Sequence, residues 1–409
     1  MGRSRQATYN MLGYTVSLFS QWLILMVIPL MSDFDDAGVF SIAVSICSIL
    51  NLVATLSLHN YQVADRYERY SENAYRMCRL TAMSVSFLCI PVIVFMLDYD
   101  LEQGLVILFY MLYRNLIHAG WVYIATLQMK DKLDYSGKCM IVEGTISFAS
   151  FAVLYVATQN LIVSTATMAL IGGGTFLILI LVGYRKYVGD TIKPLFEWEG
   201  VGALVKLGIP VMLSTLAPIV ITAIPKILLQ SDYGDAATGI FSTIASPAIV
   251  IPTLVESAFI PFIPSFSDAW KRNPSDFRRR SFILLLVILG FGVLCYITAV
   301  LLADPVFRWI YGEELADYTK YFSTLIIGIT VYTVGVCSTT LLVIRGKSKY
   351  AVAMAFMALA VSLLVSPVMI SDSGIEGATY SVVIAYAVFG LSLFICNHLT
   401  SYSKGSREV

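Results

Sequence analysis

The feature that most constrains this chain is a long apolar run that recurs from end to end, with short polar breaks between copies. A helix needs about 20 apolar residues to cross a bilayer, and these runs have that length. The composition agrees: hydrophobic residues make up 58% and charged residues 13%, against about 45–50% and about 25% in soluble domains. The pattern predicts an all-α polytopic membrane protein.

We predict twelve transmembrane helices in two parallel six-helix bundles. The first bundle is expected at residues 1–184, a cytoplasmic linker at 185–206 and the second bundle at 207–409. The predicted spans are residues 10–31, 38–58, 80–97, 105–127, 139–157, 165–184, 207–228, 238–262, 282–303, 321–344, 350–370 and 377–397.

Short internal repeats support two similar halves. DFDDAGVFSIA at Asp33–Ala43 parallels DYGDAATGIFSTIA at Asp232–Ala245, and Met129–Tyr135 parallels Ile344–Tyr350. Parallel repeats in transporters are related by an axis along the membrane normal, with the substrate between them. The repeats therefore predict alternating access through rocking of one half against the other.

Basic residues set the orientation, because Lys and Arg concentrate in cytoplasmic loops. With a cytoplasmic N-terminus, all but four of the 27 Lys and Arg residues fall on the cytoplasmic side; the exceptions are Arg114, Lys226, Arg308 and Lys320. This predicts a multi-pass protein of the cell membrane with both termini cytoplasmic. The seven cysteines are scattered without CxxC spacing, so neither disulfides nor a metal site is expected.

The stretch from Lys206 to Trp270 concentrates prolines, with seven of the chain's 13 in two apolar arms. A proline removes a backbone donor and bends or breaks a helix. We therefore expect these arms to form a bent, movable wall. The prolines are Pro210, Pro218, Pro225, Pro247, Pro252, Pro261 and Pro264.

Arg114 is the strongest candidate for a functional residue, because it is a charged side chain near the middle of the fourth predicted span. An arginine there costs about 2.5–3.5 kcal/mol on insertion scales. Tyr110 and His118 lie four residues before and after it, on the same helix face. One interpretation is a substrate-binding site for an anion in a central cavity. The other is a structural pair with a carboxylate or carbonyl groups of another helix.

Three further charges lie in predicted spans. Lys226, directly after Pro225, is either a substrate contact or a lysine that reaches the interface. Glu256 is a candidate for carrying a coupling proton or ion, or for pairing with a cation. Glu143 lies about one turn inside the fifth span, so we place it at the interface as a weaker coupling candidate.

The sequence resembles bacterial polysaccharide repeat-unit flippases of the multidrug/oligosaccharidyl-lipid/polysaccharide (MOP) exporter superfamily. Four stretches carry the resemblance in order: residues 36–80 with Tyr61-Gln62, AIPKILL at 223–229, GIFSTIASP at 239–247 with the later prolines, and SGIEGATYSVVIAY at 373–386. One departure is that the family often has a basic residue before the Tyr-Gln pair, where this chain has His59-Asn60.

The resemblance implies a MATE-like fold and a substrate, an oligosaccharide on a polyprenyl diphosphate, moved from the inner to the outer leaflet for surface polysaccharide biosynthesis. It also implies membrane lipids and possible polymerase and glycosyltransferase partners, no nucleic acid, no cofactor, and coupling to a proton or sodium gradient. Arg114 and Lys226 are available for the diphosphate. No enzyme is expected: Gly346-Lys347-Ser348 ends like a phosphate-binding loop, but Leu341 replaces its first glycine.

Alternative functions stay open. A MATE-like, cation-coupled drug or metabolite antiporter would favour an acidic cavity, and Arg114 argues against it. A major-facilitator transporter would need glycines around Asp65-Arg66, where Tyr61 and Tyr67 stand. A polymerase would need a large external loop, and the longest predicted one is only Asp304–Lys320. A non-transporting scaffold for glycan enzymes would not require Arg114 at membrane depth.

Overall fold

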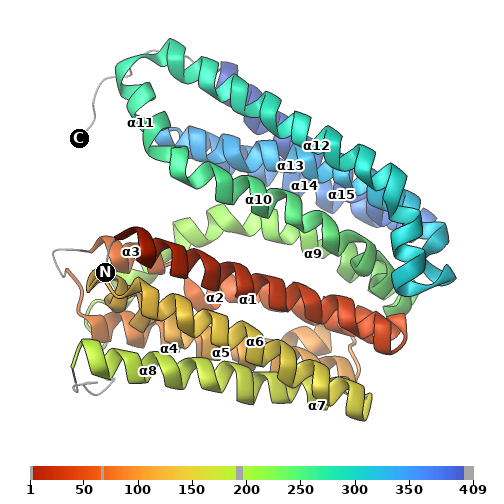
Figure 1. The fold of residues 1–409 in the computed structure, drawn as a ribbon, viewed down its shortest axis with the longest axis horizontal. Helices are drawn as coiled ribbons and strands as arrows, with labels where there is room; N and C mark the ends of the chain where they lie inside the picture. Colours follow the sequence, from red (N-terminus) through yellow and green to blue (C-terminus); the bar gives the residue numbers. More distant parts are fainter. Residues whose placement is uncertain (1–2, 66–68, 190–196, 400–409) are drawn as a thin grey trace. The chain divides into compact units, whose positions relative to one another are not determined.

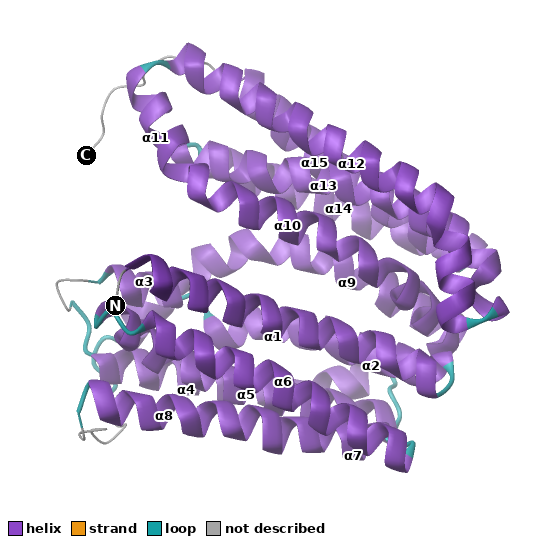
Figure 2. Cartoon of the chain, in the orientation of Figure 1, coloured by secondary structure: helices purple, strands orange, loops and turns teal. Residues whose placement is uncertain are grey.

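Helices form all of the regular structure in the computed structural model, which describes residues 3–65, 69–189 and 197–399 (Figures 1 and 2). Eleven segments of this described part are long and apolar enough to cross a membrane. The longest, Thr215–Arg272, contains the eighth predicted span and residues 215–228 of the seventh. The predicted all-α polytopic fold is therefore confirmed.

The helices pack into two compact units. The first contains residues 1–219 together with Gly234–Gly239, and the second contains Val220–Tyr233 and residues 240–409. The predicted boundaries at residues 184 and 206 separate two sequence repeats, and they stay a prediction because the two units are defined by packing instead.

The first unit is built from the helices before the linker. They are α1 (Arg3–Met31), α2 (Phe34–Thr55), α3 (His59–Ala64), α4 (Glu72–Met96), α5 (Leu101–Met129), α6 (Leu133–Thr158), α7 (Leu161–Thr167), the π-helix η1 (Met168–Gly173) and α8 (Gly174–Tyr187). The longest side-by-side packing in this unit joins α1 to α6.

The second unit contains most of the remaining helices. They are the 3₁₀ turn η2 (Ser246–Ile249), α10 (Val250–Phe259), the 3₁₀ turn η3 (Ile260–Phe262), α11 (Ile263–Arg272), α12 (Pro274–Tyr311), the 3₁₀ helix η4 (Glu313–Tyr318), α13 (Thr319–Ile344), α14 (Ser348–Ser373) and α15 (Ile375–Leu399). Here α13 and α15 pack along each other, and α14 covers α15.

Helix α9 (Val201–Ala245) belongs to both units and differs from the expected proline-broken arm. Pro210, Pro218 and Pro225 lie inside it without ending it. Its one non-helical residue is Gly234, with φ 84° and ψ −177°, a conformation that only glycine adopts readily. Two later prolines do coincide with breaks in α-helical geometry, since Pro247 and Pro261 lie in the 3₁₀ turns η2 and η3.

The two copies of the Asp-rich repeat contact each other within the first unit. A Cβ on Gly38 would lie 1.9 Å from the carbonyl oxygen of Asp235, and a Cβ on Gly239 would lie 1.8 Å from that of Phe34. Each glycine thus meets the carbonyl four residues before the other. Small residues allow such close helix crossings in membranes. Gln103 Nε2 of α5 donates to Asp235 Oδ2 at 2.7 Å and fixes the same segment.

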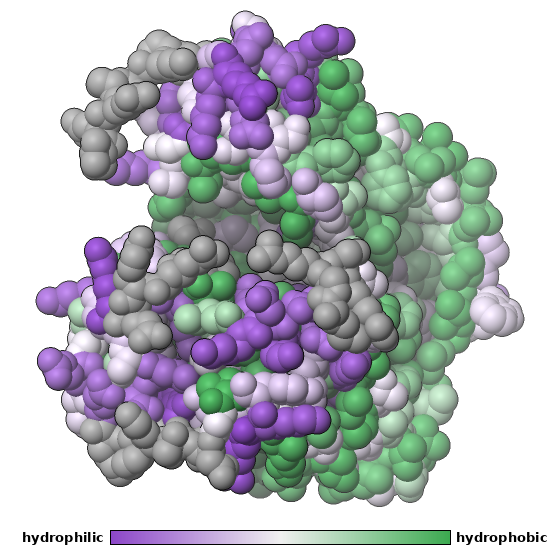
Figure 3. Space-filling view, turned by 60° about the vertical axis from the view of Figure 1, so that its left-hand side comes forward, coloured by the Kyte–Doolittle hydropathy of each residue, from purple (hydrophilic) through white to green (hydrophobic). Residues whose placement is uncertain are grey.

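The surface has the distribution expected of a membrane protein. Hydrophilic residues gather over the helix ends on the face shown in Figure 3, and hydrophobic residues cover the helix flanks. Large exposed apolar side chains such as Leu88, Phe95 and Val287 stand on these flanks. Such surface is stable where lipid, rather than water, surrounds it.

Helix α4 begins earlier than the apolar run predicts, and this difference positions the site. Ser71 caps the helix, because its hydroxyl accepts a hydrogen bond from the backbone N–H of Ala74 at 3.1 Å. A serine at this position satisfies a donor that the first helical turn leaves open. The basic residues Arg76 and Arg79, which we had expected in a cytoplasmic loop, therefore lie on a helix.

Candidate functional site

The predicted stripe on α5 exists, and its arginine lacks a carboxylate partner. Arg114 is half-buried, and its Nη1 donates to Gln21 Oε1 of α1 at 3.3 Å. Its Nε is buried without a hydrogen-bond partner in the described part of the chain. Tyr110 is buried and meets the Phe40 ring edge-on at 5.4 Å. Tyr110 therefore packs α5 against Phe40 of α2, whereas Arg114 keeps an N–H group that is available for a further hydrogen bond.

A second arginine lies beside this stripe. Arg79 of α4 is only 4% exposed, and its Nη1 donates to the backbone carbonyl oxygen of His118 at 3.1 Å. No salt bridge between described residues pairs Arg79 or Arg114 with a carboxylate. Burying a charge without a counter-ion raises the free energy of the folded protein. An anionic ligand beside such an arginine would lower this free energy.

The sequence reasoning missed Arg79 because the hydropathy run starts after it. The signal that would have found it is Ser71 followed by Glu72, a helix start that places Arg79 two turns into α4. Arg76, one turn earlier, differs in its contacts. It forms a salt bridge with Glu72, donates to Tyr184 Oη at 3.0 Å and lies 4.9 Å from the Tyr123 ring centre. Arg76 is therefore a neutralised structural arginine.

We call Arg79, Arg114 and His118 the basic cluster. Both arginines act electrostatically on the imidazole of His118, which lies on the same helix as Arg114 and whose backbone carbonyl accepts from Arg79. His118 Nε2 is buried and has no partner among the described residues, and the same holds for the side-chain oxygens of Asn115 and Asn51. Buried polar atoms normally find a partner. Together with the buried Arg79 and the half-buried Arg114, these atoms are candidates for contacts with a polar ligand.

His59 does not supply the positive charge that the family often has before the Tyr-Gln pair. It lies on the short helix α3, where burial first, and then Arg79, lowers its pKa to about 4. A backbone hydrogen bond at Trp121 acts in the opposite direction. His59 is thus neutral at pH 7. In this chain the neighbouring fixed charge is the guanidinium of Arg79.

Glu143 lies ten residues after the start of α6 and is buried by the protein, and its predicted place at the membrane interface stays a prediction. The side chain is 1% exposed. Its carboxylate accepts hydrogen bonds from Ser17 Oγ at 2.7 Å, from Ser147 Oγ at 3.2 Å and from the hydroxyl of Tyr113. Because α6 starts at Leu133, before the apolar run, Glu143 lies farther from the helix end than that run indicates. A buried carboxyl group that is held by hydroxyls can exchange a proton or bind a small cation.

Lys226 and Glu256 lie in the second unit, apart from the four predicted residues of the first. Lys226 is partly buried on α9, and Glu256 is exposed on α10 within electrostatic reach of Tyr332 on α13. The structure therefore gathers Tyr110, Arg114 and His118 on one helix face. No group of three metal-ligand side chains occurs within the described ranges.

Comparisons with known proteins agree with this architecture. Residues 66–270, half of the chain, match the family described as polysaccharide biosynthesis protein. The capsular polysaccharide biosynthesis protein CapF of Staphylococcus aureus is 21% identical over 388 residues, which cover 94% of this chain and 97% of CapF.

Two solved structures share the fold. The lipid II flippase MurJ in an inward closed conformation aligns with a TM-score of 0.72 and 13% identity, over 94% of this chain and 87% of MurJ. An inward-facing multidrug resistance MATE transporter of the MOP superfamily aligns with a TM-score of 0.67 and 13% identity, over 98% of both chains. The matched family and this shared fold together show that the chain belongs to the polysaccharide biosynthesis protein family and is a multi-pass membrane protein with the fold of these transporters.

Proposed function

We propose that this protein is a flippase that moves a polyprenyl-diphosphate-linked oligosaccharide repeat unit from the inner to the outer leaflet of the cell membrane. The movement would follow alternating access, with both termini cytoplasmic. The observation that carries the proposal is the basic cluster: two arginines and a histidine in a membrane-embedded bundle, without a carboxylate partner among the described residues.

A diphosphate is the chemical group that fits this cluster. Guanidinium groups bind phosphate oxygens with two parallel hydrogen bonds, and such charge-assisted bonds are roughly twice as strong as neutral ones. Arg114 and Arg79 would hold the diphosphate, while the unpartnered amides of Asn51 and Asn115 suit sugar hydroxyls. Lys226 is our second-unit candidate for the same headgroup. Tyr110 supports Arg114 by packing rather than by contact with substrate.

Coupling to an ion gradient is assigned to Glu143 first and to Glu256 second. Glu143 combines nearly complete burial with three hydroxyl donors, so its protonation changes the hydrogen bonding of α1, α5 and α6 together. The same carboxylate is the observation that favours the alternative function, a MATE-like cation-coupled antiporter, because a cationic substrate needs an acidic site. Polymerase and glycosyltransferase partners stay a prediction.

The test is translocation of a lipid-linked oligosaccharide by the purified protein in liposomes. We expect Arg114→Gln to lower the translocation rate about ten- to a hundredfold, because a hydrogen bond to a charged group contributes about 1.5–3 kcal/mol. Arg185→Gln is the matched control, since Arg185 is an exposed arginine at the end of α8. Equal rates for Arg114→Gln and Arg185→Gln would overturn the proposed role of the cluster.

Deletion of the protein in its host separates the two functions. The flippase predicts that lipid-linked oligosaccharide accumulates on the inner leaflet and that surface polysaccharide is lost. Unchanged glycans together with altered export of cationic compounds would establish the antiporter instead.

A further inference from the structure

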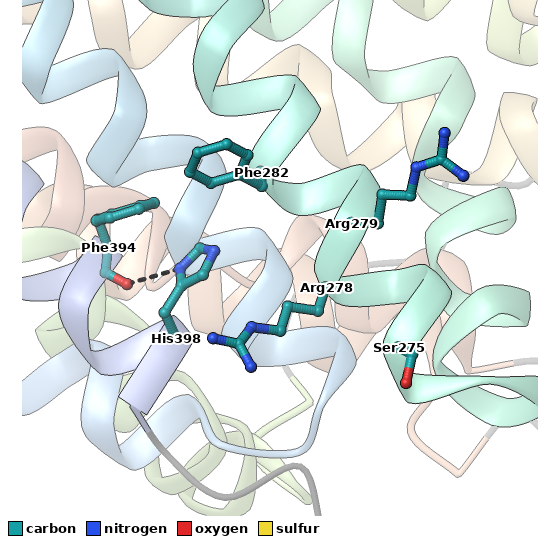
Figure 4. Close-up of a pocket in the computed structure, with 6 residues that line it drawn as sticks. All are labelled: Ser275, Arg278, Arg279, Phe282, Phe394 and His398. Carbon is teal, nitrogen blue, oxygen red and sulfur yellow. Dashed lines mark hydrogen bonds between the residues drawn. The ribbon is translucent and has the colours of Figure 1, made fainter.

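We propose that the second unit carries a separate binding site for the phosphate headgroup of an anionic phospholipid, between the beginning of α12 and the end of α15 (Figure 4). This inference does not depend on the transported substrate. The structure has an open cavity of about 580 Å³ there. Its lining consists of Ser275, Arg278, Arg279, Phe282, Phe394 and His398.

The cavity is basic. No acidic side chain occurs among the described residues that line it. The nearest acid along the chain, Asp276, forms a salt bridge with Arg280 at 2.8 Å, so its charge is balanced outside the lining. In Figure 4 Arg278 extends from α12 toward His398, whereas Arg279 leaves the helix on the other side. An anion in this cavity would therefore meet positive charge from the described lining residues.

His398 supplies an unused polar atom in the same cavity. Its Nδ1 lies 3.1 Å from the carbonyl oxygen of Phe394. Because a carbonyl only accepts, Nδ1 carries the hydrogen and donates. Its Nε2 is buried and has no hydrogen-bond partner in the described part of the chain. The Nε2 atom can accept from a headgroup hydroxyl when neutral, or donate to a phosphate oxygen when protonated.

The end of α15 that carries His398 is held in place by a neighbouring contact. Arg345 Nη1 donates to Asn397 Oδ1 at 2.9 Å, and its guanidinium lies 5.2 Å from the Trp270 ring centre. The residue before His398 is thus joined to the end of α13. The imidazole consequently has a fixed position relative to α12, as a binding site requires.

The occupant is a lipid rather than free phosphate because one side of the cavity is apolar. Phe282 and Phe394 line it. The arginine run ends at Arg280, two residues before Phe282. The next residues of α12 form an exposed apolar face with Ile283 47%, Leu286 52% and Val287 62% exposed. A phosphate beside the arginines would place its acyl chains along this face. Basic pockets at the ends of transmembrane helices are known to suit anionic headgroups.

The experiment measures lipid retention by the full-length protein with native mass spectrometry, using dioleoyl phosphatidylglycerol and dioleoyl phosphatidylcholine as probes. We expect wild type to retain phosphatidylglycerol preferentially, and Arg278→Gln/Arg279→Gln to lower that preference about tenfold, the effect of roughly one lost charge-assisted interaction. Lys271→Gln/Arg272→Gln is the matched control. It removes two exposed charges from the adjacent end of α11, outside the cavity lining.

Two outcomes would overturn the proposal. Equal losses in both double variants would show attraction to diffuse surface charge, and displacement of the lipid by millimolar inorganic phosphate would show a site for a soluble anion. His398→Phe keeps both arginines and tests the geometry if the arginine variant fails to fold. We expect a several-fold loss of phosphatidylglycerol for His398→Phe, and an unchanged preference would contradict the site.

Discussion

The guanidinium of Arg79 donates to the backbone carbonyl oxygen of His118 at 3.1 Å, so a buried charge of α4 is anchored on the helix turn that follows Arg114. The carbonyl contributes only a partial negative charge, and the guanidinium keeps most of its capacity for an anion. This contact turns a single intramembrane arginine on α5 into a two-helix cationic site.

Arg79→Gln is expected to lower translocation of the lipid-linked oligosaccharide by about ten- to a hundredfold, for the same reason as the change at Arg114. Arg79→Lys should recover only part of the rate, because an ammonium group keeps the charge but loses the planar two-point contact. The measurement is the initial rate in liposomes at matched protein density. Full activity of Arg79→Gln would show that its charge only anchors α5.

Glu143→Gln is expected to abolish the dependence of transport on an ion gradient while the protein still folds, because the amide oxygen can still accept from Tyr113 and Ser147 and the amide N–H can donate to Ser17 Oγ. The donors to the carboxylate itself are Ser17, Tyr113 and Ser147. Glu143→Ala leaves these donors unpaired and should lower stability by about 1–3 kcal/mol. Transport driven by a proton gradient and by a sodium gradient is compared in separate arms. Unchanged coupling in Glu143→Gln would exclude this carboxyl group as the coupling residue.

Gly38→Ala and Gly239→Ala should each lower the thermal unfolding temperature, because the added Cβ would lie within 2 Å of a backbone carbonyl oxygen. Overpacking of this kind costs typically 1–3 kcal/mol. Gly174→Ala is the matched control within a helix of the same unit, since nothing lies within 4 Å of a Cβ there. That change should stabilise the protein by up to about 1 kcal/mol. Equal effects at all three positions would argue against the close crossing.

The pH dependence of stability should contain a contribution from His59. Its pKa is lowered to about 4 in the folded protein, whereas an unfolded histidine has a pKa of about 6.5. Between these two pKa values the unfolded chain binds more protons than the folded protein. The contribution of His59 to the free energy of unfolding is therefore fully present above pH 6.5 and is lost as the pH falls toward 4. His59→Gln should flatten the unfolding temperature in this window. A variant with the wild-type pH slope would contradict the shift.

The number and approximate position of most transmembrane helices could be predicted, because the bilayer sets the length of a span and each span appears as an apolar run. The residues at which the helices begin and end could not be predicted in this way. The hydropathy pattern begins after Arg79 and close to Glu143, so it placed the first in a loop and the second at the interface. Both residues belong to helices whose first turns are polar and begin well before the apolar run. For α4 the capping residue Ser71 contains that information, whereas Lys132 before α6 makes no side-chain cap.

The sequence also did not single out the residue that interrupts helical geometry in α9. A proline removes one backbone hydrogen bond, and α9 continues through Pro210, Pro218 and Pro225 despite this loss. Gly234, in contrast, adopts a backbone conformation that ends helical geometry outright. The π-helix η1 could not be predicted either, because its sequence, MALIGG, is compatible with an ordinary apolar helix.

The contact of Gly38 with Asp235 has a consequence for how the protein is made. A ribosome that has reached residue 206 has already synthesised all of α1 to α8, yet the segment that closes the glycine face of α2 does not exist until Gly239 has been added. The first unit is therefore completed by sequence from beyond the linker. A chain that ends at residue 206 would therefore lack the segment Gly234–Gly239, and the face of α2 that carries Gly38 would have no helix packed against it.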